Sequence, residues 1–372
     1  MLTLFLRFVF LTLAFAPPHL SKVFAEPGGS CRPELNFHQG WLGADGGSSV
    51  SLGDGRSLWL FGDTFIGREG ALDRAQTTLI ANSIGIARCT PAGFTIDYAW
   101  KKSGSTAQAF FPSKDGLDFW PVSAILVDGL LQIILIAVDK HPAQANGLGF
   151  VIKGTSLATI KDWHKDPEAW TLDIQDFLRD DRVIAGVSLL AHESELLLYS
   201  SYASAAGQPG ILMRCPYHDL RECRPDLLLT KGWIPFAKAD LGQAKILLDG
   251  AATEFSVTRH GSEYLWVHNS LAAGFPAQGV WLSRAAHPEG PFGPPALLAS
   301  FPQGTDLKSS QIFCYASKEH RELSGEQNLQ ISFACNSFDF FGELLRNLRV
   351  YTLWTLSYDL EGQKAELFAP QP

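Results

Sequence analysis

The sequence predicts an all-β fold, a five-bladed β-propeller, and three observations lead to it. A short sequence motif, in which a polar residue lies at the start of an apolar strand, recurs five times. Its five copies are anchored on Ser49, Ser123, Ser188, Ser256 and Gln311. Each copy runs into a turn and a second apolar strand, and in three copies the third strand starts with glycine. Anchors 55 to 74 residues apart are typical of a propeller, which repeats one sheet-forming unit around an axis.

The expected hairpins follow one another along the chain. Asp-Gly between alternating apolar runs is a strong hairpin signal, found at Asp54-Gly55 and Asp128-Gly129. The five predicted pairs of strands are 48–52 with 57–61, 122–127 with 131–138, 187–191 with 196–200, 255–259 with 264–268, and 311–316 with 329–334. Further strands are expected at 82–88 and 93–96.

The third strands of blades two to four are expected to begin at Gly149, Gly210 and Gly279. The segment 157–182 is richer in Trp, Asp and Lys, and we expect a loop there with one short helix. A β-sandwich would also use short strands, but the matched strand triplets favour the propeller.

A chain of 372 residues could hold two domains, but all-β folds often use this length as one. Because no low-complexity tract or long charge run interrupts it, we expect a single domain over residues 26–372. The formal net charge of −8 argues against a nucleic-acid partner, which would require clustered Lys and Arg.

Residues 1–25 are expected to form a signal peptide. The stretch 1–16 is almost wholly apolar, and Ala25 is suited to the cleavage position. A membrane anchor is the alternative, but the apolar run is shorter than the ~20 residues that span a bilayer. The expected location is therefore periplasmic or secreted, with no stable membrane span after processing.

All six cysteines follow the predicted cleavage site, which favours disulfides in an exported protein. Position suggests Cys215 with Cys223 around a short loop and Cys314 with Cys335 across a hairpin, which leaves Cys31 with Cys89. A metal site is the alternative, but no Cys-x-x-Cys or His-x-x-x-His spacing supports one, so no metal or other cofactor is expected.

Polar residues gather at the start of first strands and at the end of second strands. In a propeller the two strands are antiparallel, so both positions lie on one face of the disc. They are Asp45, Trp120, Thr253, Glu254 and Ser309 at the starts, and Asp63, Asp139, Tyr202, His268, Asn269 and Asn336 at the ends. This face is expected to carry a polar pocket.

The segments 40–46 (GWLGADG) and 58–65 (LWLFGDTF) closely resemble the opening of domain-of-unknown-function family 4185. Asn82-Ser83 and the segment 253–257 (TEFSV) are also similar to that family. Its characterised members include secreted endo-D-arabinanases, and its architecture is similar to that of glycoside hydrolase family 43. The resemblance implies a five-bladed propeller that cleaves a furanosidic glycan such as arabinan.

The resemblance agrees with the chemistry of the carboxylates. Glycoside hydrolysis needs one carboxyl group to protonate the leaving oxygen and another to activate water. Asp45 is expected to be the general base and Glu254 the general acid of an inverting enzyme. Asp63 is expected to orient Asp45 or to raise its pKa by like charge. Alternatively, Asp45 caps a turn and Asp63 anchors backbone amides between blades.

Five further residues are candidates for substrate binding. Trp41 and Trp120 could supply rings on which sugars stack, while His268, Asn269 and Asn82 could contact hydroxyl groups. Tryptophan is equally a large core residue, and a lone histidine at a strand end is often a satisfied core residue.

The predicted partner is thus an oligosaccharide or polysaccharide substrate. Two other functions stay open. A non-catalytic propeller that binds carbohydrate would need aromatic platforms but no carboxylate pair, and a protein-binding propeller would present an apolar rim.

Overall fold

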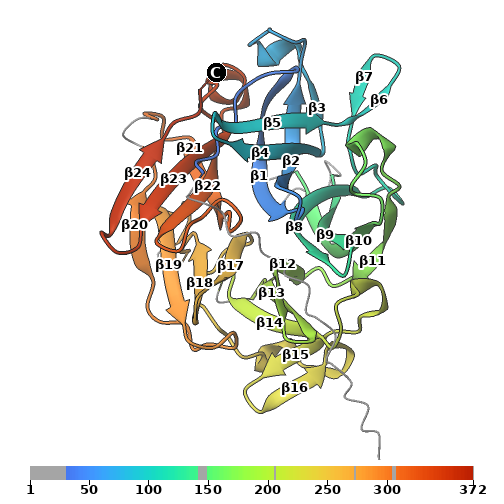
Figure 1. Ribbon diagram of the computed structural model, residues 1–372, viewed down its shortest axis with the longest axis vertical. Coiled ribbons are helices and arrows are strands. Elements are labelled where there is room, and N and C mark those ends of the chain that lie inside the picture. Colours follow the sequence, from blue (N-terminus) through green and yellow to red (C-terminus); the bar gives the residue numbers. More distant parts are fainter. Residues whose placement is uncertain (1–30, 141–148, 205–206, 272–273, 304–306, 372) are drawn as a thin grey trace, which may run out of the picture.

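The computed structural model describes residues 31–140, 149–204, 207–271, 274–303 and 307–371, so the predicted signal peptide lies outside the described residues. Five antiparallel sheets stand around one axis in chain order, from the blue sheet at the top of Figure 1 to the red sheet beside it. The predicted five-bladed β-propeller is confirmed.

Each blade is a sheet whose strands follow the chain outward from the axis. Blade one comprises β1 (Trp41–Ser51), β2 (Arg56–Ile66), β3 (Thr78–Ile80), β4 (Ser83–Thr90) and β5 (Gly93–Ala99). Blade two comprises β8 (Asp118–Val127), β9 (Leu130–Asp139), β10 (Val151–Ile160) and β11 (Asp173–Leu178). Between them, β6 (Lys101–Ser103) and β7 (Thr106–Gln108) form a separate small hairpin.

The remaining blades repeat the plan. Blade three comprises β12 (Val183–His192), β13 (Glu195–Tyr202), β14 (Gly210–Cys215), β15 (Asp226–Leu229) and β16 (Gly232–Pro235). Blade four comprises β17 (Phe255–His260), β18 (Glu263–His268), β19 (Gly279–Ala285) and β20 (Ala296–Ser300). Blade five comprises β21 (Ile312–Glu319), β22 (Asn328–Ser337), β23 (Leu353–Asp359) and β24 (Lys364–Phe368).

Helical structure in the described part of the chain is confined to single turns. These are η1 (Arg74–Gln76), η3 (Pro167–Ala169), η4 (Leu220–Glu222), η5 (Phe236–Lys238), η6 (Leu241–Gln243) and the π-helical η7 (Phe340–Leu344). The segment 157–182, expected to be a loop with a short helix, instead contains the end of β10, the turn η3 and the whole of β11. The Trp and Lys content misled the prediction, because β11 is an outer strand with a partly exposed face.

The first strands of the blades form a closed ring. β1 contacts β8, β8 contacts β12, β12 contacts β17, β17 contacts β21, and β21 contacts β1. The hairpin that begins blade two is set by local turn chemistry. Asp128 and Gly129 both adopt positive φ (52° and 74°), as a tight two-residue hairpin turn requires.

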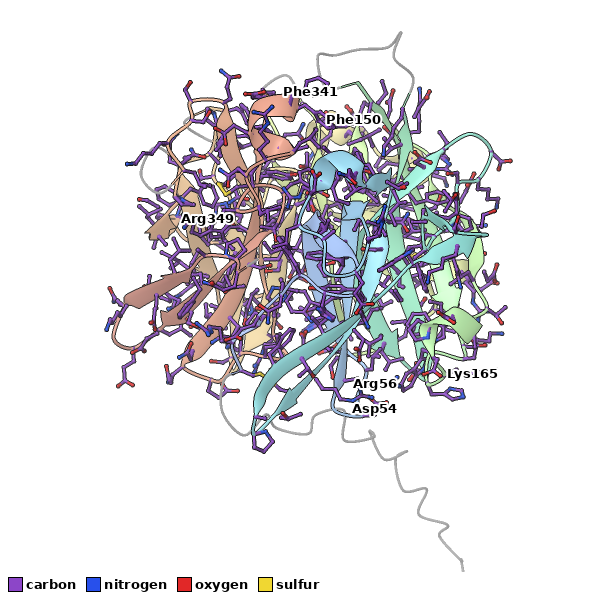
Figure 2. All side chains as sticks on the ribbon, turned by 90° about the horizontal axis from the view of Figure 1, so that it is seen from above. Asp54, Arg56, Phe150, Lys165, Phe341 and Arg349 are labelled. Carbon is purple, nitrogen blue, oxygen red and sulfur yellow. A yellow bond between two sulfur atoms is a disulfide. The ribbon has the colours of Figure 1, made fainter. Side chains whose placement is uncertain are left out.

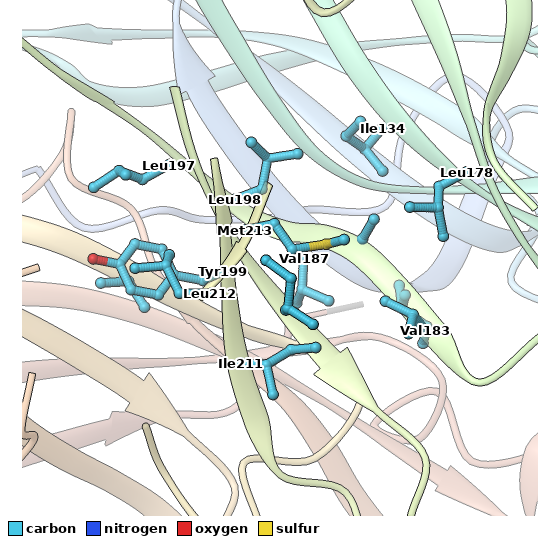
Figure 3. Close-up of a cluster of buried hydrophobic side chains, with 14 of the residues drawn as sticks. Ile134, Leu178, Val183, Val187, Leu197, Leu198, Tyr199, Ile211, Leu212 and Met213 are labelled. Atoms are coloured by element: carbon cyan, nitrogen blue, oxygen red, sulfur yellow. The ribbon is translucent and has the colours of Figure 1, made fainter. Parts of the chain in front are cut away.

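The hydrophobic core lies between the faces of neighbouring blades. One cluster joins blade two to blade three and blade three to blade four, with buried side chains such as Ile134, Val187 and Met213. Figure 3 shows these residues converging from several strands. Strands such as β9 are buried along most of their length because both sheet faces are covered.

Four of the five anchors have a common structural role. Each serine hydroxyl bonds to a neighbouring blade: Ser123 to Gly186 O at 2.5 Å, Ser188 to Val257 N at 2.9 Å, Ser256 to Glu319 N at 2.7 Å, and Ser49 to His320 Nδ1 at 2.6 Å. The repeat therefore marks the polar links between innermost strands. Gln311 is different, because it lies exposed just before β21.

The ring closes between blade one and blade five through a buried arginine. Arg74, 1% exposed, donates hydrogen bonds from its guanidinium to the carbonyls of Leu42 (2.7 Å), Val350 (2.6 Å) and Tyr351 (3.2 Å). It also donates to Leu344 O at 3.0 Å. Since one residue satisfies carbonyls of both blades, it fixes the first blade against the last.

The two disulfides suggested by position, Cys215–Cys223 and Cys314–Cys335, and the remaining pair, Cys31–Cys89, are confirmed. Disulfides persist in oxidising compartments, so they agree with an extracellular or periplasmic location. Among the helices of the described residues, none is long and apolar enough to cross a membrane.

Candidate active site

The candidate carboxylates lie on one face of the propeller. In blade one, the start of β1 pairs with the end of β2, which brings the positions of Asp45 and Asp63 to the same edge. Figure 2 shows Phe150 and Phe341 on one face and the β1–β2 turn, with Asp54 and Arg56, on the other. Asp45 and Asp63 lie in the halves of β1 and β2 that are farther from that turn.

Asp45 stands at an irregular part of β1, where the register with β2 shifts on both sides of it. The Tyr315 hydroxyl donates a hydrogen bond of 2.6 Å to its Oδ2. The pKa of Asp45 is raised to about 7, first by burial and then by the nearby negative charges of Asp63 and Glu254. Tyr315 and Lys318 act in the opposite direction. Asp45 can therefore hold or release a proton near neutral pH.

Glycine makes room for this carboxyl group. A Cβ at Gly62 would lie 2.3 Å from Asp45 Oδ1. The Gly-Asp pair at the end of β2 thus serves two functions: Asp63 supplies a carboxylate, and Gly62 leaves space for Asp45.

Asp63 is held by blade two. Its Oδ1 accepts hydrogen bonds from Trp120 Nε1 at 2.9 Å and from Lys140 Nζ at 2.6 Å. Burial raises the pKa of Asp63, while the Lys140 ammonium group opposes that rise. The negative charge of Asp63 also raises the pKa of Asp45, as expected for two neighbouring carboxyl groups.

Glu254 immediately precedes β17 in blade four, and its side chain is 18% exposed. Lys318 Nζ, from β21 of blade five, lies 2.6 Å from Glu254 Oε1. The Lys318 side chain is only 2% exposed. Because a buried ammonium group needs a compensating charge, this ion pair is part of the site rather than a surface contact.

Of the two tryptophans, the structure brings Trp120 to the carboxylates but not Trp41. Trp120 is partly exposed and packs edge-on against Phe150 at 4.8 Å. Trp41 is fully buried and stacks on Tyr98 at 4.3 Å. It therefore offers no ring face to a sugar. We expected Trp41 to bind substrate, but the structure places it in the core.

The other three predicted contacts to substrate are also buried. Asn82 donates to the carbonyls of Phe111 and Phe119 and accepts from Phe111 N, so it joins blade one to blade two. Asn269 bonds to Ser317 of blade five through both its amide nitrogen and its oxygen.

His268 is enclosed in blade four, and burial lowers its pKa to about 4, so it is neutral at physiological pH. Asparagine side chains can hydrogen-bond between blades as well as to a ligand. The sequence alone does not distinguish these two roles.

Sequence reasoning missed Lys318, Tyr315 and Tyr351. The ladder between β21 and β22 shifts register between Tyr315 and Lys318, and Ala316 has a φ of 59°. Strand alternation fails across such a bulge, so the pattern did not predict which side chains face the site. Burial raises the pKa of Tyr351, and the negative charges of Asp45 and Asp63 add to that rise.

The structure does not group three or more potential metal ligands among its described residues. A cavity of about 390 Å³ lies at the opposite ends of the strands, lined in part by Lys161, His218 and Arg221. Among its lining side chains, Arg221 pairs with Asp219 and His218 with Asp128. Asp45, Asp63 and Glu254, in contrast, gather carboxylates of two blades in one electrostatic environment, and we take them as the candidate site.

Solved structures with this fold include a candidate hydrolase from Bacteroides ovatus ATCC 8483, with a TM-score of 0.69, 19% identity and coverage of 86% of each chain. At this identity the likeness shows the fold alone. An exo-1,5-α-L-arabinanase from a bovine ruminal metagenomic library has a TM-score of 0.48, 13% identity, and coverage of 90% of this chain and 99% of that one. An α-L-arabinofuranosidase from Clostridium thermocellum ATCC 27405 has a TM-score of 0.49, 9% identity, and coverage of 88% and 94%.

No curated protein matches the chain in sequence. The family whose sequence model matches is not number 4185, which the blade-one motifs suggested, so that assignment is not confirmed. The match is to the family described as domain of unknown function DUF5005 and extends over residues 35–351. Because these residues make up most of the chain, the protein belongs to the DUF5005 family.

Proposed function

We propose that this protein is an exported, inverting glycoside hydrolase that cleaves a furanosidic glycan such as arabinan. The observation that carries the proposal is the electrostatic difference between two carboxyl groups from different blades. Burial raises the pKa of Asp45 to about 7, whereas Glu254 forms an ion pair with the buried Lys318. Two titratable groups in contrasting environments are suited to acid and base roles.

These surroundings favour Asp45 as the general acid and Glu254 as the general base, which is the reverse of the assignment expected from sequence. Asp45, protonated below about pH 7, is suited to donate its proton to the glycosidic oxygen as the carbon–oxygen bond breaks. Glu254, paired with an ammonium group, is suited to take a proton from the water that attacks the anomeric carbon. Exchange of one proton with solvent then restores both groups.

Asp63 has a supporting role in this proposal. Its negative charge raises the pKa of Asp45, which helps the acid keep its proton until substrate is bound. Trp120 and Lys140 hold Asp63 in place from blade two. Asp63 is therefore a positioning residue.

Two further features support the finer parts of the proposal. The furanosidic substrate rests on the resemblance of the segments 40–46 and 58–65 to the arabinanase-containing family 4185. Export rests on the apolar segment 1–16 with Ala25 and on three disulfides in the mature chain.

The test is a screen of the mature chain, residues 26–372, against arabinans and other furanosidic polymers, read by released reducing ends. Proton NMR of the first products then reports the anomeric configuration. Products of inverted configuration support the full proposal, and retained configuration rejects the inverting mechanism. Binding of one of these glycans without cleavage would instead support the alternative function, a non-catalytic carbohydrate-binding propeller.

A further inference from the structure

Several phenylalanine rings stand exposed on the face that carries the carboxylates. Phe275 is 60% exposed, Phe338 56%, Phe340 43% and Phe341 75%, and Phe313 beside them is partly buried. Figure 2 shows Phe341 on this face, opposite the Asp54 and Arg56 turn. A gathering of large apolar side chains in water is costly, and such patches mark binding surfaces.

Three of these rings form a connected surface, which we call the aromatic shelf: Phe275, Phe313 and Phe338. The ring centroids lie 5.2 Å apart for Phe275 and Phe313, and 4.7 Å apart for Phe313 and Phe338. The shelf combines residues of blade four and blade five. Since the segments come from distant parts of the chain, its formation depends on the assembled propeller.

The aromatic shelf is continuous with the candidate active site. Phe313 lies 5.7 Å from the ring of Tyr315 on the same strand, β21. The Tyr315 hydroxyl donates to Asp45 and accepts a hydrogen bond of 3.3 Å from Asn336 Nδ2. Contacts between aromatic rings therefore connect the aromatic shelf to Tyr315, which hydrogen-bonds to the proposed acid, Asp45.

The loop that carries Phe338 is held in place by hydrogen bonds. Phe338 N donates to Gln311 O at 3.1 Å, and Asp339 N donates to Ser337 Oγ at 3.1 Å. Asp339 also accepts from Gly342 N at 2.8 Å, which caps the turn η7. Exposed rings on a loop with these internal bonds are preorganised, which lowers the entropy cost of binding a ligand.

We propose that the aromatic shelf binds the sugar units that adjoin the cleaved bond of a neutral glycan chain. Sugars suit this surface because their C–H faces can pack on aromatic rings while their hydroxyls reach polar groups such as Asn336 and Tyr315. This inference rests on the proposed function, because continuity with the carboxylate site identifies the occupant. It makes Phe338 and Phe275 determinants of polymer binding.

The test measures binding of debranched arabinan and a panel of other neutral glycans by affinity electrophoresis. Phe338→Ala and Phe275→Ala should each weaken retention of the bound polymer about tenfold, and Phe338→Tyr should preserve it. Tyr217→Ala is the matched control, because Tyr217 is an exposed aromatic residue near the opposite ends of the strands and should have no effect. Near-UV circular dichroism of each variant checks that the fold is intact.

Each outcome decides the inference separately from the proposed function. Weaker binding in the shelf variants supports it, whether or not the wild-type protein cleaves the polymer. Unchanged binding in folded shelf variants overturns it, as does a wild-type protein that retains no glycan of the panel. Loss of self-association in Phe338→Ala, with glycan binding unchanged, would instead assign the shelf to a second copy of the chain.

Discussion

Lys318 Nζ lies 2.6 Å from Glu254 Oε1 and joins the innermost strands of blade five and blade four. The same ammonium group acts on Asp45, whose pKa it lowers against the larger effect of burial. Groups from blades one, four and five therefore share one electrostatic environment. This is the arrangement from which acid and base roles can be separated experimentally.

Leaving-group dependence should distinguish the two roles. A substrate with an activated aryl leaving group needs no proton from the enzyme, whereas every substrate needs an activated water. Asp45→Asn should therefore lower kcat/KM ~10²–10⁴-fold on the natural glycan but retain most activity on an aryl furanoside. Glu254→Gln should lose activity on both, as measured by kcat/KM. The opposite pattern would return the base role to Asp45.

The pH dependence of turnover carries the same information. The pKa of Asp45 is raised from 3.8 to about 7, so this group is protonated below about pH 7 in the folded protein. If its proton is donated in catalysis, kcat/KM should fall about tenfold per pH unit above that value. A profile that instead rises through pH 7 would mean that the ionised form of Asp45 is the active one.

Arg74→Met should destabilise the propeller strongly. Arg74 is buried and donates to carbonyls of blade one and blade five, and its loss leaves those acceptors without partners. The expected loss in free energy of unfolding is about 3–5 kcal/mol by urea denaturation. Arg284→Met, which removes an exposed ion pair with Glu263, is the control and should cost less than ~1 kcal/mol. Comparable losses in the two variants would refute the closing role of Arg74.

Glu322 should make stability depend on pH. Burial raises its pKa from 4.5 to about 7, while the Ser49 hydroxyl hydrogen-bonds to its carboxylate. Between pH 4.5 and about pH 7 the folded state binds more protons than the unfolded state. The free energy of unfolding therefore falls as the pH rises through this range. The Tm of Glu322→Gln minus the Tm of wild type should therefore be larger at pH 8 than at pH 5. The exposed Glu326→Gln is the control, and an equal pH response in both variants would contradict the assignment.

The fold could be predicted because its signals are local. The turns at Asp54-Gly55 and Asp128-Gly129 fix hairpins within a few residues, and alternation fixes which strands follow. The serine anchors were informative for a reason the sequence did not reveal, since Ser123, Ser188 and Ser256 link neighbouring blades by hydrogen bonds.

The candidate site was only partly predictable, because its geometry depends on bulges and burial. Asp45, Asp63 and Glu254 could be selected from their places at strand ends, but Lys318 could not, since the bulge after Tyr315 breaks the alternation of β21. Trp41 looked like a sugar platform because a large aromatic ring suits both a core and a binding surface. Burial, which separates these roles, is a property of the assembled blades.

The central claim is that the carboxyl groups of Asp45 and Glu254 hydrolyse a glycan, and released reducing ends test it most directly. On the furanosidic polymer that the wild-type protein cleaves fastest, Asp45→Asn and Glu254→Gln should each release product at least ~10²-fold more slowly. Asp54→Asn, which changes an exposed aspartate on the opposite face, should match wild type. Wild-type rates in all three folded variants would contradict the account.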